Sequence, residues 1–169
     1  MVFGAEKKLF ELTVGKKDKK DKVKKLQKLM AINMDRTLTE LEKSDWGEPE
    51  YQTSLVINCH RIRKIPLRYF TAEDCRILIS QRISLPYVIP VAIQLLEGNA
   101  LADGGYYAGD LLFKLLTTDR SFWKENPLLW EKLIRIYTEQ DIRSIWEAKK
   151  PQDVCFLDAF EGIFPQQQP

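Results

Sequence analysis

The chain has 169 residues, of which 44% are apolar, 11% aromatic and 30% charged. These values are those of an ordinary soluble globular protein with one domain, long enough to bury a sizeable core. No run approaches the roughly 18 apolar residues that a membrane span needs, and residues 1–13 contain no apolar secretory segment. We therefore predict a cytoplasmic protein without a membrane partner, whose three cysteines are buried thiols rather than a disulfide frame.

The net charge of +2 conceals an uneven distribution along the chain. Residues 1–36 hold 11 Lys and Arg against 5 Asp and Glu, a balance of +6, whereas residues 37–169 hold 15 against 19, a balance of −4. We therefore predict two parts, a basic N-terminal helical extension (residues 1–33) and a mildly acidic helical domain (residues 34–169).

The extension combines a lysine run, residues 16–22, with a narrow apolar stripe made of Val23, Leu26, Leu29 and Met30. We interpret it as a solvated basic helix that packs this stripe on the domain. A nucleic-acid or membrane-surface arm is the alternative, but the segment lacks aromatics interleaved for stacking on bases, and its apolar face has no Trp or Phe for a bilayer. A third interpretation is that the protein begins at Met34.

The domain opens with a helix that has a recognisable N-terminal cap. Thr37 is followed three residues later by Glu40, which is the spacing of a capping box. Turn-forming residues between 44 and 49 end this helix. The next segment, residues 55–62, is apolar at most positions, so we predict a helix capped by Ser54 and keep a strand as the alternative.

Three short apolar helices are predicted between residues 66 and 116. The first starts with a second capping box, Thr71 and Asp74. The second ends at Gly98 and Asn99, and its buried stripe consists of Val88, Ala92, Leu95 and Leu96. Within it, Pro90 either opens the regular helix after an irregular turn or kinks it. The third has Asp110 as its candidate N-cap.

Asn126 and Pro127 give the N-cap and first position of a longer helix, residues 128–140. Its predicted buried stripe consists of Leu129, Leu133, Ile136 and Tyr137. Residues 142–148 continue or restart this helix, and apolar positions between 156 and 160 suggest a last short one. No strand alternation holds over more than a few residues, so we predict an all-α single compact domain of about seven or eight helices.

The sequence contains no set of residues that suits catalysis. His60 is the single histidine, and its neighbour Cys59 points about 100° away on a helix, so the two cannot form a nucleophile–base pair. No second Cys/His pair completes a zinc site, and no glycine pattern of a phosphate-binding loop occurs. The adjacent acids Glu73 and Asp74 suit a helix cap better than a carboxylate pair. We therefore predict no catalytic residue, metal or cofactor, and a protein that is not an enzyme.

A binding surface is the remaining possibility, and residues 103–110 are its candidate. A tight turn at Asp103, Gly104 and Gly105 is predicted ahead of two tyrosines. Rigid amphipathic aromatics are good interface residues. We therefore predict that a partner binds Asp103, Tyr106, Tyr107 and Asp110. The alternative is that the two tyrosines only close the core over the next helix.

Several separated motifs of the chain occur in order over residues 34–125. They are Leu-x-x-Leu-Glu-x-x-x-Trp-Gly at 38–47, Pro-Leu at 66–67, Phe-Thr-x-Glu-Asp-x-Arg-Ile-Leu-Ile-x-Gln at 70–81, Leu-Pro-Tyr-x-Ile-Pro at 85–90 and Tyr-x-Gly-Asp-Leu-Leu at 107–112. Together they resemble the immunity proteins of contact-dependent growth inhibition (CDI).

That resemblance implies a bacterial cytoplasmic protein that binds the C-terminal toxin domain of its cognate CDI effector and neutralises it. A nuclease is the expected toxin, and the acidic balance of residues 37–169 suits a partner with a basic cleft. No direct contact with nucleic acid is expected under this interpretation. The alternative is a nucleic-acid-associated regulator that uses the lysine-rich extension, and deletion of residues 1–33 would distinguish the two.

Overall fold

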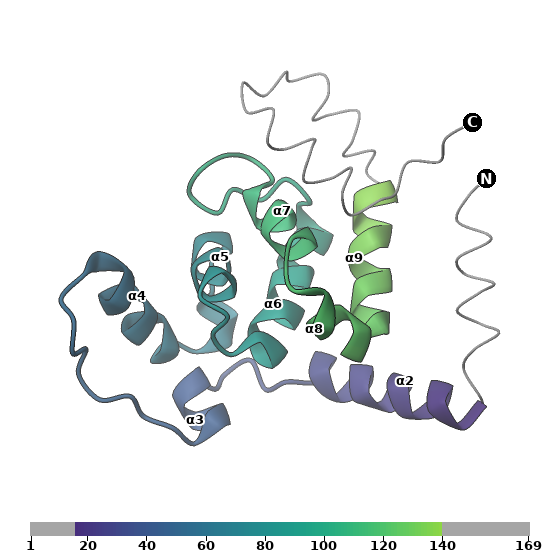
Figure 1. The fold of residues 1–169 in the computed structure, drawn as a ribbon, viewed down its shortest axis with the longest axis horizontal. Coiled ribbons are helices and arrows are strands. Elements are labelled where there is room, and N and C mark those ends of the chain that lie inside the picture. The colour runs from purple at the N-terminus through teal and green to yellow at the C-terminus, as the bar shows by residue number, and fades with distance from the viewer. Residues whose placement is uncertain (1–15, 140–169) are drawn as a thin grey trace.

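The computed structural model describes residues 16–139, and every regular element in that range is helical (Figure 1). The α-helices are α2 Lys16–Met30, α3 Leu38–Glu42, α4 Ser54–Arg63, α5 Ala72–Ser80, α6 Leu85–Gly98, α7 Asp110–Leu116, α8 Arg120–Glu125 and α9 Pro127–Glu139, with a 3₁₀ turn, η1 Leu67–Tyr69, before α5. Within these residues no strand occurs, and residues 55–62 are helical. The predicted all-α fold is confirmed.

Helix α6 forms the centre of the fold and packs against α5, α7 and α9 (Figure 1). Buried positions surround the middle of this helix instead of following one stripe: Val88, Ile89, Pro90, Val91, Ala92, Ile93 and Leu96 are all buried, whereas the predicted Leu95 is only partly buried. The predicted stripe was therefore too narrow, because a helix covered on several sides has no solvated face. α9 keeps the expected stripe, with Leu129, Leu133, Ile136 and Tyr137 buried.

The helix is continuous through Pro90, so the regular helix does not begin there. α6 starts at Leu85, and Pro86 takes an early position where a missing N–H costs nothing. Pro90 removes the one hydrogen bond that its N–H would have donated to the carbonyl of Pro86. Burial of its ring in the core offsets part of this cost.

Two predicted capping boxes are present, and two other predicted caps are wrong. Both Thr37 of α3 and Thr71 of α5 accept from the backbone N–H three residues later, and the acid at that position accepts in return. In α4, however, Thr53 is the cap and Ser54 is already helical. In α7 the cap is Gly109, whose φ of 94° is left-handed, and Asp110 is the first helical residue.

The basic helix α2 lies against α9 and α6 (Figure 1). Leu26, Leu29 and Met30 pack on the core as predicted, but Val23 is exposed. The apolar side of α2 therefore covers part of the core, while Lys19, Lys20, Lys24, Lys25 and Lys28 are exposed. None of the helices in residues 16–139 is long and apolar enough to cross a membrane.

The predictions for residues 142–148 and 156–160 lie outside the described part of the chain, as does the third cysteine, Cys155. The division into an extension and a domain at residue 33 stays a prediction.

Candidate functional site

The predicted binding residues lie in the connection between α6 and α7, and one carboxylate organises it. Asp110 is only 3% exposed, and its two oxygens accept hydrogen bonds from the backbone N–H groups of Gly104 and Tyr106. Arg76 of α5 completes the arrangement, because its Nε lies 3.5 Å from Asp110 Oδ2 and donates to the carbonyl of Gly104. The loop is thus tied to two helices by a buried ion pair.

Two glycines allow the loop to approach this ion pair. A Cβ added to Gly104 would lie 2.7 Å from Asp110 Oδ1 and 3.0 Å from Arg76 Cδ, so a larger residue does not fit without displacing the pair. Gly105 has a φ of 106°, which strains any residue with a side chain. Its N–H donates to Asp103 Oδ1 at 2.7 Å, which is the turn that the sequence predicted.

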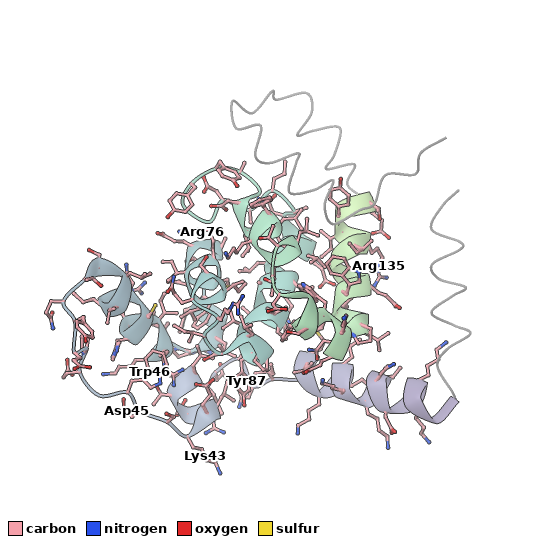
Figure 2. All side chains as sticks on the ribbon, in the orientation of Figure 1. Lys43, Asp45, Trp46, Arg76, Tyr87 and Arg135 are labelled. Atoms are coloured by element: carbon pink, nitrogen blue, oxygen red, sulfur yellow. The ribbon has the colours of Figure 1, made fainter. Side chains whose placement is uncertain are left out.

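The loop presents an aromatic side chain on a fixed support. Tyr106 is 75% exposed, and the Arg76 guanidinium lies 4.0 Å from the centroid of its ring. Arg76 itself appears in Figure 2 on α5, beneath the loop. Because Arg76 is also held by Asp110, the ring has a platform that is fixed before any partner arrives.

The structure brings the four predicted residues into one loop but gives them different positions. Asp103 and Tyr106 are exposed, and Tyr107 is half-exposed. Asp110 points inward and supports the loop instead of presenting a charge to solvent. The alternative, that both tyrosines close the core, does not hold for Tyr106.

The cysteines, the histidine and the acid that were considered as catalytic candidates are buried or contact neighbouring residues. Cys59 and Cys75 are free and buried, and burial raises the pKa of both thiols, so neither is activated as a nucleophile. His60 lies with Nδ1 3.2 Å from the carbonyl oxygen of Gly47, and its ring packs on Trp46. Asp74 caps α5 and pairs with Arg61 at 2.9 Å. Within residues 16–139 no cluster of His, Cys, Asp and Glu could hold a metal ion.

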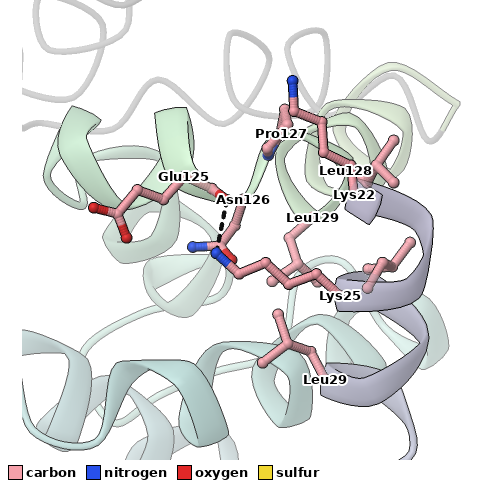
Figure 3. Close-up of a pocket in the computed structure, with 9 residues that line it drawn as sticks. Lys22, Lys25, Leu29, Glu125, Asn126, Pro127, Leu128 and Leu129 are labelled. Carbon is pink, nitrogen blue, oxygen red and sulfur yellow. Dashed lines mark hydrogen bonds between the residues drawn. The ribbon is translucent and has the colours of Figure 1, made fainter. Parts of the chain in front are cut away.

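A hollow between α2 and the start of α9 is too small to be a ligand site (Figure 3). Its volume is about 10 Å³, which is the space of a single water molecule. Leu26, Leu29 and Leu129 line its apolar side, and Lys25 Nζ crosses its rim to donate to the carbonyl of Glu125 at 2.9 Å. This hollow marks where the basic helix is attached to the domain.

A second organised loop, between α3 and α4, was missed by the sequence reasoning. Arg63 is only 2% exposed and donates to Glu42, to Ser84 Oγ and to the carbonyl of Ser44. Its guanidinium lies 4.0 Å from the ring centroid of Trp46. An arginine at the end of a helix ordinarily lies in solvent, so nothing in the local sequence distinguishes this one.

The CDI immunity protein family model matches residues 40–133. This chain belongs to the CDI immunity proteins. The match spans more than half of the 169 residues, from α3 to α9, and includes both organised loops. No curated protein and no solved structure matches the chain.

The matched segment of this immunity protein does not include the basic helix. α2 ends at Met30, ten residues before the matched segment begins. The sequence motifs had predicted a similar extent, residues 34–125. Both loops therefore belong to the part of the chain that carries the family relationship, and the lysine run does not.

Proposed function

We propose that this protein neutralises the C-terminal toxin domain of its cognate CDI effector by binding it stoichiometrically. Membership of the CDI immunity proteins is the observation that carries the proposal. It is supported by the chemistry of residues 16–139, in which Cys59 and Cys75 are buried and the His60 ring packs on Trp46 and contacts the Gly47 carbonyl. Binding alone can neutralise a toxin by occupying its surface.

The α6–α7 loop is our proposed contact with the toxin. Asp103 and Tyr106 supply an exposed charge and an exposed ring on a loop held by Asp110 and Arg76. A fixed aromatic loses little conformational freedom on binding, so most of its contact energy is retained. Asp110 contributes by positioning this loop.

A nuclease with a basic cleft is the proposed toxin. Residues 37–169 carry a balance of −4, and such a surface accelerates association with a positively charged partner. Protection must hold against each incoming toxin molecule, which calls for a dissociation constant on the order of nanomolar, about −12 kcal/mol.

Titration calorimetry of the full chain with the cognate toxin domain tests the proposal. We expect one-to-one binding that is nanomolar or tighter, and inhibition of the toxin at equal concentrations. Asp103→Lys is expected to weaken binding and its salt dependence. Glu131→Lys on α9 is the matched control, because it changes an exposed acid by the same charge on a different helix. Absence of binding by the wild-type protein would refute the proposal.

The nucleic-acid alternative needs a different test from deletion of residues 1–33. α2 packs its apolar side on α6 and α9, so the deletion would expose core residues as well as remove charge. Replacing Lys20, Lys24 and Lys28 by Gln removes exposed charges and leaves the apolar side intact. We expect this variant to inhibit the toxin as the wild type does, whereas a regulator acting through α2 would lose its function.

A further inference from the structure

The α3–α4 loop and α4 expose an unusual number of large apolar side chains. Eight such side chains are exposed in the described residues, and half of them lie between residues 46 and 57: Trp46, Tyr51, Leu55 and Ile57. Single exposed apolar residues are ordinary, but a group on one short segment indicates an interaction surface. We call the segment 45–57 the α4 edge.

The position of α4 explains how both of its faces can carry apolar residues. The helix packs mainly on α5, through Cys59 and Ile62, and lies at the margin of the bundle (Figure 1). Leu55 shares the helical spacing of Cys59 and Ile62 and is 44% exposed at the start of α4. Ile57 lies on the opposite side of the helix, one turn before His60, and is 41% exposed. The core accounts for the Cys59 side of α4 and leaves Ile57 unexplained.

Trp46 is held rigidly and is nevertheless 43% exposed. Arg63 lies 4.0 Å from the centroid of the indole, and the His60 ring meets it edge-on at 5.4 Å. Both supports are themselves fixed, Arg63 by Glu42 and His60 by its contact with the Gly47 carbonyl. Tryptophan is among the side chains enriched in the residues that dominate protein interfaces.

The exposed charge of the α4 edge is negative. Residues 45–51 contain Asp45, Glu48 and Glu50 and no Lys or Arg. Among the nearby cations, Arg63 is buried, Arg61 pairs with Asp74, and Lys64 lies 4.0 Å from Glu48, whereas Lys43 is exposed two residues before Asp45. Two copies of this chain meeting symmetrically here would place acids against acids, which is unfavourable. A partner with a basic surface is favoured instead.

Helix α4 and the α6–α7 loop both contact the start of α5. Arg61 of α4 binds Asp74, and the neighbouring Glu73 lies beneath Gly105, at 3.2 Å from where a Cβ would stand. Trp46 and Asp45 lie on the side of the molecule opposite to the lysine-rich α2 (Figures 1 and 2). Trp46 rests on Arg63, which donates to Ser84 beyond the other end of α5, so one partner contacts Trp46 and Tyr106 together only if it spans α5.

We infer that the α4 edge is a second docking surface for the same toxin domain, with Trp46 at its centre and the acids facing basic toxin residues. This inference rests on the proposed function. Because Arg63 and His60 already fix Trp46, the tryptophan is expected to act mainly on the dissociation rate, and the acids mainly on the association rate.

Calorimetry and stopped-flow binding of the full chain to the cognate toxin domain test the inference. We expect Trp46→Ala to weaken binding tenfold or more through faster dissociation, and Glu50→Lys to slow association at low salt. Ile57→Arg is expected to weaken binding at least as strongly as Trp46→Ala. Val23→Arg is its matched control, since Val23 is 37% exposed on the opposite side and Ile57 is 41% exposed.

The outcomes separate this inference from the proposed function. A wild-type protein that binds the toxin, while Trp46→Ala and Ile57→Arg variants of unchanged melting temperature bind equally well, would overturn the α4 edge and leave the proposed function standing. A wild type that does not bind would overturn both. Sedimentation of the free protein tests whether a second copy of the chain covers the α4 edge instead. A wild-type dimer that Ile57→Arg converts to a monomer would show this and would overturn the inference.

Discussion

The α6–α7 loop and the α3–α4 loop are built on the same plan with opposite charge. In the first, buried Asp110 accepts hydrogen bonds from backbone N–H groups. Its partner Arg76 places its guanidinium 4.0 Å from the centroid of the Tyr106 ring. In the second, buried Arg63 donates to a backbone carbonyl and itself supports Trp46 at 4.0 Å. The comparison shows that an exposed aromatic can be fixed in place from below by a guanidinium whose own position is set in the interior.

The two buried charges differ in how completely they are satisfied. Asp110 has two N–H donors and a cation 3.5 Å away that is largely buried as well. Arg63 pairs with the more exposed Glu42, and its Nε has no hydrogen-bond partner. Loss of Asp110 therefore leaves more buried polar groups uncompensated than loss of Arg63 does.

The largest effect is expected for Asp110→Ala. The change leaves the Arg76 charge and two backbone N–H groups without their acceptor, and we expect a loss of about 3–5 kcal/mol in the free energy of unfolding. Urea denaturation monitored by circular dichroism measures it. Asp110→Asn keeps one acceptor and should lose less. If both variants unfold at the wild-type urea concentration, the carboxylate does not organise this loop.

A smaller loss, about 1–3 kcal/mol, is expected for Arg63→Met. Methionine fills much of the same space and removes the unpartnered Nε, while Glu42 can turn to solvent because it is partly exposed. The same urea measurement applies, together with Trp46 fluorescence, which should shift as the ring loses its support. A loss larger than that of Asp110→Ala would reverse the order that the comparison predicts.

Removing the exposed rings of Trp46 and Tyr106 should change the free energy of unfolding only slightly. Trp46→Ala and Tyr106→Ala each forfeit one cation–π contact at an exposed site, so we expect a loss of about 1 kcal/mol or less. Thermal unfolding of the two variants, compared with that of the buried-core change Leu78→Ala, checks this. A drop for either ring variant as large as that for Leu78→Ala would mean that the ring is part of the core.

The smallest effect concerns pH and lies at the start of α3. Hydrogen bonds from the Thr37 backbone N–H and hydroxyl lower the pKa of Glu40, with a minor contribution from Arg36. Because the folded pKa is lower than the unfolded one, the stabilisation is complete above the unfolded pKa and is lost as pH falls through the folded pKa. The stability difference between wild type and Glu40→Gln should therefore shrink on acidification. A difference that grows at low pH would contradict the capping role.

The sequence allowed both capping boxes to be predicted because each depends only on residues three apart. The stripe of α9 and the turn at Asp103 are likewise local patterns, and both were identified correctly. Asp110 was assigned to the right loop, but it is the first residue of α7 and not its N-cap. A carboxylate at a helix start suits an N-cap, and the sequence does not show that the preceding loop folds back over it.

The sequence by itself determined that this protein is helical, where most of its helices begin and which family it resembles, because these depend on periodicity, caps and ordered motifs. Only the tertiary structure decided which charged residues are buried. Arg63 and Asp110 lie far from their partners Ser84 and Arg76 along the chain, and folding brings them together. Whether a charge is buried depends on what packs over it, and that packing set which aromatic rings, Trp46 and Tyr106, are fixed at the surface.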